Sequence, residues 1–117
     1  MNPVIETIVY PVEDIMRAKQ MFSRLLGIEP HVDKPYYVGY QVGNMEIGLA
    51  PNGNSQAEPG PTIFYTVEDI EQSLQILLDA GGKTIQEPKD VGGGKLVATV
   101  RDPEENVIGL IQMPSGA

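Results

Sequence analysis

Few side chains in this 117-residue sequence have the type and spacing needed for catalysis or metal binding. The chain has no cysteine, which excludes disulfides, thiolate nucleophiles and sulfur-ligated metals together. His31 is the single histidine, and the serines fall in expected helices, a connector and the tail, so no Ser–His nucleophile pair is indicated. Glu46 lies on an expected strand, but one carboxylate is too little to name an acid–base reaction. The residue types therefore identify no catalytic group.

The charge balance narrows the class of partner. Sixteen acidic residues against eight basic ones give a net charge of −8, which argues against nucleic acid and favours cationic ligands through long-range attraction. No apolar run approaches the roughly 18 residues that cross a bilayer, so no membrane partner is expected. The N-terminus lacks a basic stretch followed by an apolar one, so we expect no signal peptide and a cytoplasmic location.

Two short segments occur twice in the same order. Val12-Glu13-Asp14-Ile15 returns as Val67-Glu68-Asp69-Ile70, and Ile47-Gly48-Leu49 returns as Ile108-Gly109-Leu110. In each half, an apolar β-branched run precedes the first segment, and a helical pattern begins with it. Two matched pairs in one order indicate an internal repeat of a supersecondary unit.

Hydrophobic periodicity predicts the same elements in each half. The first half is expected to hold a strand over 5–10, a helix between the cap Asp14 and Gly27, and strands over 28–32, 36–42 and 45–50. The second half is expected to hold a strand over 62–67, a helix from the cap Asp69 to Gly81, and strands over 83–87, 95–101 and 107–112. The prediction is an α+β fold in one domain, with β-α-β-β-β modules over 4–50 and 62–112 joined by a linker over 51–61.

These features resemble the vicinal oxygen chelate superfamily of glyoxalase I, bleomycin-resistance proteins and extradiol dioxygenases. The matching residues are Val12, Asp14, Leu25-Leu26-Gly27, Asp69, Asp102-Pro103 and Asn106. The resemblance covers about 4–112 and implies two modules whose sheets form a cup around a ligand or metal. One departure is Glu105, which stands where the family usually has glycine, a residue that reaches positive φ at low cost.

The resemblance also implies where a metal would be bound. In similar enzymes the first and last strand of each module supply His or Glu ligands, and those positions fall here on Thr7, Gly48, Thr62 and Gly109. Hydroxyls and bare backbone are poor ligands for such an ion, so we expect no metal and no other cofactor. Glu46 shares the strand face of Gly48, whereas Glu6 points away from that of Thr7. A rebuilt site of His31, Glu46 and water is a weaker alternative.

Glycine in the middle of a strand often marks close approach by another group, so the two glycines suggest empty volume where metal ligands stand in similar enzymes. Strand alternation predicts one mostly apolar surface suited to a small molecule. Its expected residues are Thr7, Val9, Glu46, Gly48, Ala50, Thr62, Phe64, Thr66, Val107, Gly109 and Ile111. Tyr36, Tyr37 and Tyr40 would add stacking walls, or else serve sheet packing or a dimer contact.

The function predicted from sequence is a metal-free small-molecule-binding protein of the bleomycin-resistance type, which would sequester a drug or metabolite. The resemblance implies a homodimer. One alternative is a lyase, isomerase or dioxygenase with an atypical metal site. Another is a structural or regulatory module whose cup is filled by its own side chains, which predicts no cavity at Gly48 and Gly109.

Overall fold

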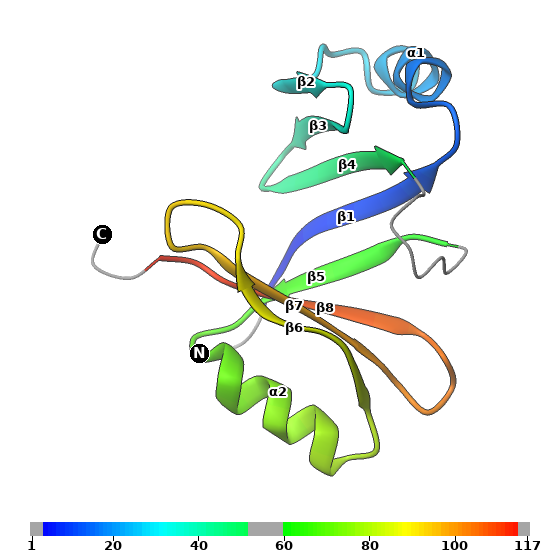
Figure 1. The fold of residues 1–117 in the computed structure, drawn as a ribbon. Coiled ribbons are helices and arrows are strands. Elements are labelled where there is room, and N and C mark those ends of the chain that lie inside the picture. Colours follow the sequence, from blue (N-terminus) through cyan, green and yellow to red (C-terminus); the bar gives the residue numbers. More distant parts are fainter. Residues whose placement is uncertain (1–3, 52–59, 115–117) are drawn as a thin grey trace. The chain divides into compact units, whose positions relative to one another are not determined.

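The computed structural model describes residues 4–51 and 60–114, which form two helices and eight strands (Figure 1). The predicted α+β fold class is confirmed, and the order β-α-β-β-β occurs twice. The elements are β1 (Ile5–Val12), α1 (Ile15–Leu26), β2 (Val32–Lys34), β3 (Tyr37–Val42), β4 (Met45–Pro51), β5 (Thr62–Thr66), α2 (Ile70–Asp79), β6 (Lys83–Asp90), β7 (Leu96–Arg101) and β8 (Val107–Gln112). Most of the predicted linker, and the end of the tail, lie outside the described residues.

The chain divides into two compact units. The N-terminal unit is Thr7–Thr62, and the C-terminal unit combines Met1–Glu6 with Ile63–Ala117. In the N-terminal unit the strand order is β2-β3-β4-β1, and in the C-terminal unit it is β5-β8-β7-β6. Within each unit the first and last strands of the module, β1 with β4 and β5 with β8, pair in parallel. A parallel pair needs a crossover connection, and the helix of each module lies in that connection.

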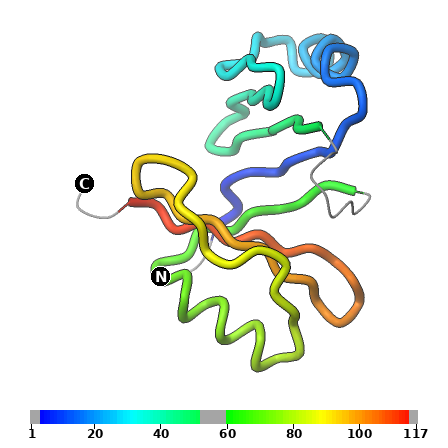
Figure 2. The backbone as a smooth tube through the Cα atoms, viewed as in Figure 1, coloured from blue at the N-terminus to red at the C-terminus, as the bar shows by residue number. Residues whose placement is uncertain are grey.

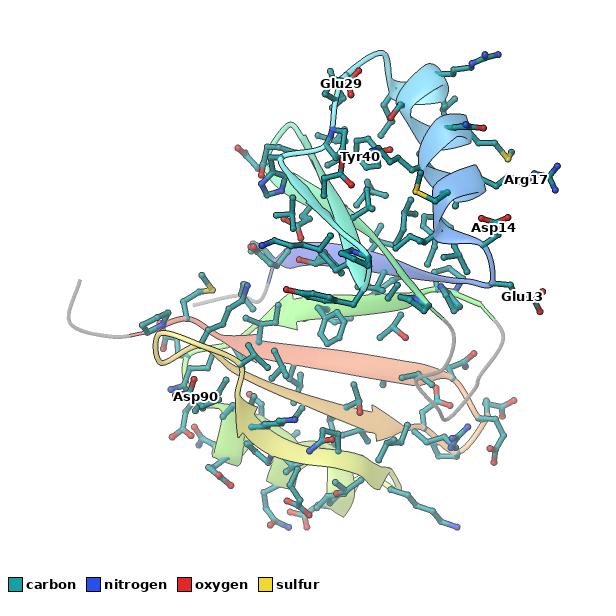
Figure 3. The ribbon with its side chains drawn as sticks, turned by 45° about the horizontal axis from the view of Figure 1, so that its top comes forward. Glu13, Asp14, Arg17, Glu29, Tyr40 and Asp90 are labelled. Atoms are coloured by element: carbon teal, nitrogen blue, oxygen red, sulfur yellow. The ribbon has the colours of Figure 1, made fainter. Side chains whose placement is uncertain are left out.

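In the N-terminal unit, α1 packs on one face of the strands. Asp14 caps this helix by accepting a hydrogen bond from the Arg17 N–H at 3.1 Å, and Gly27 ends it with φ 71°. The core beneath the helix contains Val38, Tyr40 and Leu49, with Tyr10, Val12, Ile15, Ala18, Phe22, Leu26 and Ile47 packed against them. Figure 3 shows Tyr40 between β3 and α1, and Asp14 at the start of the helix. One face of this sheet is thereby used for the core.

The C-terminal unit is built in the same way. Asp69 caps α2 by accepting from the Gln72 N–H at 3.1 Å. Its core consists of Ile70, Leu74, Ala98, Val100 and Leu110, with Val67, Leu77, Leu78 and Leu96 packed against them. In the part of the chain that the structure describes, no helix is long and apolar enough to cross a membrane.

The strand predicted over 28–32 is wrong in position, because β2 covers Val32–Lys34. Gly27 turns the chain out of the helix, and Pro30 has no N–H to give to a ladder. Pairing begins at His31, whose N–H donates to the Gly39 carbonyl at 2.8 Å. The prediction for 83–87 is too short, since β6 continues to Asp90 across two register shifts.

The glycine run between β6 and β7 forms a hydrogen-bonded hairpin turn (Figure 2). The Gly92 N–H donates to Asp90 Oδ1 at 2.7 Å, and the Val91 N–H donates to the Lys95 carbonyl at 2.9 Å. Gly92, Gly93 and Gly94 all have positive φ, which glycine adopts without a side-chain clash. The three glycines therefore allow a tight turn whose backbone conformation is unfavourable for other residues.

The turn before β8 places Glu105 in the left-handed region, with φ 72°. Asp102 organises this turn, because its Oδ1 accepts from the Glu104 and Asn106 N–H groups, each at 2.8 Å. The hydrogen bonds from Asn106 hold the pKa of the Asp102 carboxyl below its ordinary value. Glu105 therefore keeps the positive φ that glycine adopts at low cost, although it is not glycine.

Candidate functional site

The sheet face opposite α1 brings together the sequence-predicted residues of the N-terminal unit. Thr7 pairs with Glu46 and Val9 with Gly48 across β1 and β4, while Gly39 pairs with Gly48 across β3 and β4. Directly paired residues point to the same side of a sheet, so these side chains share one face with Tyr37 and Ala50. Thr7 is buried, and Val9, Tyr37, Glu46 and Ala50 are partly buried.

The Tyr37 ring lies over two paired glycines. A Cβ atom built on Gly39 would lie 2.9 Å from Tyr37 Cε2, and one built on Gly48 would lie 2.7 Å from both Cε1 and Cζ. The ring therefore occupies the space that two side chains would otherwise fill. The prediction of empty volume at Gly48 is wrong, because an aromatic ring from the neighbouring strand is seated there.

Glu46 connects this ring to His31. The Tyr37 hydroxyl donates to Glu46 Oε2, and Glu46 Oε1 lies 2.7 Å from His31 Nε2. The Glu46 side chain is 21% exposed and the His31 side chain 44% exposed, so the cluster reaches solvent. We call Tyr37, Glu46 and His31 the carboxylate cluster.

Burial of Tyr37, together with its hydrogen bond to Glu46, raises the pKa of the phenol well above its ordinary value. The phenol therefore stays protonated near neutral pH and serves as a hydrogen-bond donor to the carboxylate. This donor holds one carboxylate oxygen in place above the glycine pair.

The other two tyrosines do not join this face. Tyr40 is fully buried on the side of α1, where its hydroxyl donates to the Lys19 carbonyl at 3.0 Å and lies 2.8 Å from Ser23 Oγ. The prediction that Tyr40 lines the ligand surface is wrong, because alternation along β3 turns residues 38 and 40 to the helix and residues 37 and 39 away from it. Tyr36 precedes β3 and is 67% exposed.

The C-terminal unit repeats the ring-on-glycine arrangement without a carboxylate. Phe64 pairs with Gly109 across β5 and β8, and a Cβ atom on Gly109 would lie 2.6 Å from Phe64 Cε1. Thr66 pairs with Ile111 on the same face, and Thr62 lies on the Phe64 side of β5. The expected empty volume at Gly109 is therefore also filled by a ring, and ligand binding by these residues stays a prediction.

Sequence reasoning missed the role of Gly39, and it brought His31 and Glu46 together only in the weaker alternative of a rebuilt metal site. Gly39 stands two residues after Tyr37 on the same strand, which is the spacing at which a ring can lean along the strand over a bare backbone. That spacing is a usable signal. The contact of His31 with Glu46 depends on where β2 begins, which the sequence pattern misplaces.

The comparison with protein families identifies the fold's relatives. The model of the Glyoxalase/Bleomycin resistance protein/Dioxygenase superfamily matches residues 4–110. The chain belongs to this superfamily. The resemblance inferred from the repeated segments is thus confirmed, and this membership covers both modules. No curated protein matches the sequence.

Solved structures support the same fold. A hypothetical protein from Bacillus halodurans superposes with a TM-score of 0.78 at 18% identity, covering 100% of this chain and 99% of that chain. A superfamily member from Vibrio splendidus superposes with a TM-score of 0.73 at 17% identity, covering 96% of this chain and 100% of that chain. The Mn(II)-bound glyoxalase from Novosphingobium aromaticivorans superposes with a TM-score of 0.69 at 14% identity, covering 92% of this chain and 38% of that chain.

The residues at the superfamily's metal positions do not fit a divalent ion. Thr7 and Thr62 offer neutral hydroxyls, and Gly48 and Gly109 offer no side chain, whereas such an ion needs imidazole or carboxylate ligands. Each of the two glycines is also covered by a ring. Within residues 4–51 and 60–114, no group of three or more His, Cys, Asp or Glu side chains is placed to hold a metal. His31 and Glu46 come together as two possible metal ligands that are hydrogen-bonded to each other.

Proposed function

We propose that this superfamily member is a small-molecule-binding protein that works without the divalent ion of the metal-dependent members. The observation that carries the proposal is the Tyr37 ring seated on Gly39 and Gly48, with its hydroxyl bound to the partly exposed Glu46 carboxylate. Small-molecule sites combine apolar and aromatic walls with a few fixed polar groups, and this face has that composition.

The C-terminal unit supports the proposal with a second aromatic surface. Phe64 lies over Gly109 in the same way, and Thr66 and Ile111 continue that face. Each unit therefore offers an aromatic ring to a ligand, Tyr37 in the N-terminal unit and Phe64 in the C-terminal unit, and the N-terminal unit adds the Glu46 carboxylate. The net charge of −8 favours cationic over anionic ligands. A homodimer belongs to the same proposal, because superfamily members of this type commonly pair.

Intrinsic tyrosine fluorescence provides the test. The chain has five tyrosines and no tryptophan, so quenching by an aromatic ligand on Tyr37 is not hidden by indole emission. Metal-free bleomycin and a panel of small aromatic compounds would be titrated against the wild-type protein and the Tyr37→Leu and Phe64→Leu variants. Tyr36→Leu is the matched control, because Tyr36 is exposed and lies outside the face.

The expected result is saturable binding whose dissociation constant, checked by NMR titration because Tyr37→Leu also removes the fluorescent reporter, rises in Tyr37→Leu or Phe64→Leu and is unchanged in Tyr36→Leu. Binding that survives in both variants would place the ligand elsewhere and overturn the proposed site. Native mass spectrometry of the same samples would give the oligomeric state, and a monomer at micromolar concentration would remove the homodimer from the proposal.

A structural or regulatory module is the second candidate, because rings of the chain itself fill the space at Gly48 and Gly109. In that case the Tyr37→Leu and Phe64→Leu variants lose stability, and no compound of the panel binds the wild-type protein. The enzyme alternative rests on the His31–Glu46 pair alone, and it requires metal retention or a turnover that Glu46→Gln abolishes.

A further inference from the structure

The hydrogen-bond donors of the carboxylate cluster are engaged in bonds within the cluster. The Tyr37 hydroxyl carries one proton, and it donates that proton to Glu46 Oε2. The raised pKa of this phenol keeps the proton on Tyr37. The phenolic oxygen can therefore offer an incoming ligand only lone pairs.

Glu46 itself is an acceptor with unused capacity. An ionised carboxylate has about four lone-pair positions on its two oxygens, and the cluster occupies one on each oxygen. With 21% of its side chain exposed, the group is open to solvent on one side. A ligand that approaches from solvent thus meets acceptor atoms of Glu46.

His31 completes the same pattern. Its Nε2 lies 2.7 Å from Glu46 Oε1, and a neutral imidazole in this position donates from Nε2 and leaves Nδ1 as an acceptor. With the imidazole neutral, the polar atoms that the cluster leaves without a hydrogen bond, His31 Nδ1 and the remaining lone pairs of Glu46, are acceptors.

Neighbouring side chains do not supply the missing donors. Thr7, which pairs with Glu46 on β1, is buried at 7% exposure, so its hydroxyl is not presented to solvent. Gln41, which pairs with Glu46 on β3, directs its Nε2 to the Gly43 carbonyl at 2.8 Å. Within the described residues, neither strand partner of Glu46 therefore donates a side-chain hydrogen bond to its carboxylate.

We infer that the carboxylate cluster binds a cationic N–H donor, an ammonium or amidinium group, attached to an aromatic or apolar body that lies against Tyr37. The inference rests on the proposed small-molecule-binding function and names its ligand class. The cation donates to Glu46, and the adjoining aromatic ring provides a favourable surface for both the cation and the body. Carboxylates, phosphates and purely carbonyl-bearing ligands meet only acceptors and are rejected.

The test uses three probes of similar size and different charge: benzamidine, benzyl alcohol and benzoate. Dissociation constants would be measured by NMR titration at pH 8. Benzamidine should bind at least about tenfold more tightly than benzyl alcohol, the smallest effect expected of a charge-assisted hydrogen bond, and benzoate should bind most weakly. Signals of residues on β3 and β4 should move on binding.

Two variants separate contact from general charge. Glu46→Gln removes the carboxylate and introduces an amide donor, so the preference for benzamidine over benzyl alcohol should disappear. Glu13→Gln removes the same charge from an exposed residue next to Asp14, the cap of α1 (Figure 3). This variant should keep the preference for benzamidine. If Glu46→Gln does not fold, salt dependence in the wild-type protein replaces it. High salt should weaken benzamidine binding and leave benzyl alcohol binding unchanged.

The outcomes distinguish this inference from the function on which it rests. If the three probes bind equally well, or benzoate binds most tightly, the cation inference is overturned while small-molecule binding stands. If Glu13→Gln loses the preference as fully as Glu46→Gln, the effect comes from net charge and the assigned contact is overturned. If neither these probes nor the aromatic panel bind, both proposals fail together.

Discussion

Replacing Gly48 with alanine should destabilise the protein, and the loss should vanish when Tyr37 is also replaced by alanine. In the native structure a Cβ atom on Gly48 would lie 2.7 Å from two carbons of the Tyr37 ring, well inside the distance of an ordinary carbon contact. The ring cannot simply turn away, because its hydroxyl is bound to Glu46 and its other edge lies on Gly39. The added methyl group must therefore displace the ring.

The expected magnitude comes from two opposing terms. Forcing one extra methyl group into an occupied space costs about 1–3 kcal/mol. Alanine in a strand interior is favoured over glycine by about 0.5–1 kcal/mol. With both terms taken at the middle of their ranges, Gly48→Ala should therefore lose about 1 kcal/mol in the wild-type background, and at most about 2.5 kcal/mol. In the Tyr37→Ala background only the favourable term remains, so the coupling between the two positions should be about 1–3 kcal/mol.

Urea unfolding of the four proteins in the cycle, followed by circular dichroism, measures these free energies. The C-terminal unit supplies a matched control, because Gly109→Ala meets the Phe64 ring in the same way. Phe64→Ala should rescue Gly109→Ala, and Tyr37→Ala should not. The cross-combination thus separates the local clash from any general loosening.

Two results would refute the reasoning. If Gly48→Ala is neutral or stabilising in the wild-type background, the Tyr37 ring does not rest on Gly48. If Phe64→Ala rescues Gly48→Ala as well as Tyr37→Ala does, the coupling does not come from the contacts described here.

Four further predictions follow from single features. Glu105→Gly should stabilise the protein by up to about 1.5 kcal/mol, because the left-handed conformation costs a non-glycine residue about 1–2 kcal/mol, of which glycine gives back about 0.5–1 kcal/mol through the greater entropy of its unfolded chain. Thermal unfolding would show a raised midpoint, and a lowered midpoint would contradict the prediction. Tyr37→Phe should reduce the loss of stability at alkaline pH. The raised pKa of Tyr37 stabilises the fold below the ordinary phenol pKa of 10.0, and this contribution declines as the pH rises above that value. An equal fall in urea midpoint from pH 9 to pH 11 in both proteins would count against this prediction. Asp14→Ala should cost about 1 kcal/mol in urea unfolding through loss of the helix cap, and an unchanged midpoint would show that the cap is dispensable. Protein incubated with Ni²⁺, Zn²⁺, Fe²⁺ or Mn²⁺ and buffer-exchanged should retain no ion in native mass spectrometry; one retained ion that His31→Ala releases would instead favour the enzyme alternative.

The sequence predicts those parts of the fold that depend on local rules. Asp14 and Asp69 are recognisable as caps because their carboxylates need only the first-turn N–H groups of their own helices. The strand faces follow from alternation, which correctly places Glu46 and Gly48 on one side of β4. Glu105 is singled out by the resemblance and not by a local rule, because the superfamily usually has glycine there, and the structure shows a positive φ at this position.

The parts that depend on contacts between strands are not predictable in this way. A glycine at position 48 is compatible with an empty space or with a neighbour's ring, and only the pairing of Gly39 with Gly48 decides for the ring of Tyr37. The hydrogen bond from His31 to Glu46 depends on the start of β2. The aromatic ring of Tyr40 suggests a ligand contact, but Tyr40 stands three residues after Tyr37 on β3, so alternation turns it to the helix side.

The division of the chain between its two units also sets an order for folding during synthesis. Thr7–Thr62 is continuous in sequence, so all of its partners have been made once residue 62 leaves the ribosome. The C-terminal unit is discontinuous, since the Thr66 N–H donates to the Val4 carbonyl at 2.8 Å and the Thr66 hydroxyl bonds to the backbone of Val4. Val4 is therefore translated some sixty residues before the strand to which it is hydrogen-bonded, while the unit that carries the carboxylate cluster can already be complete.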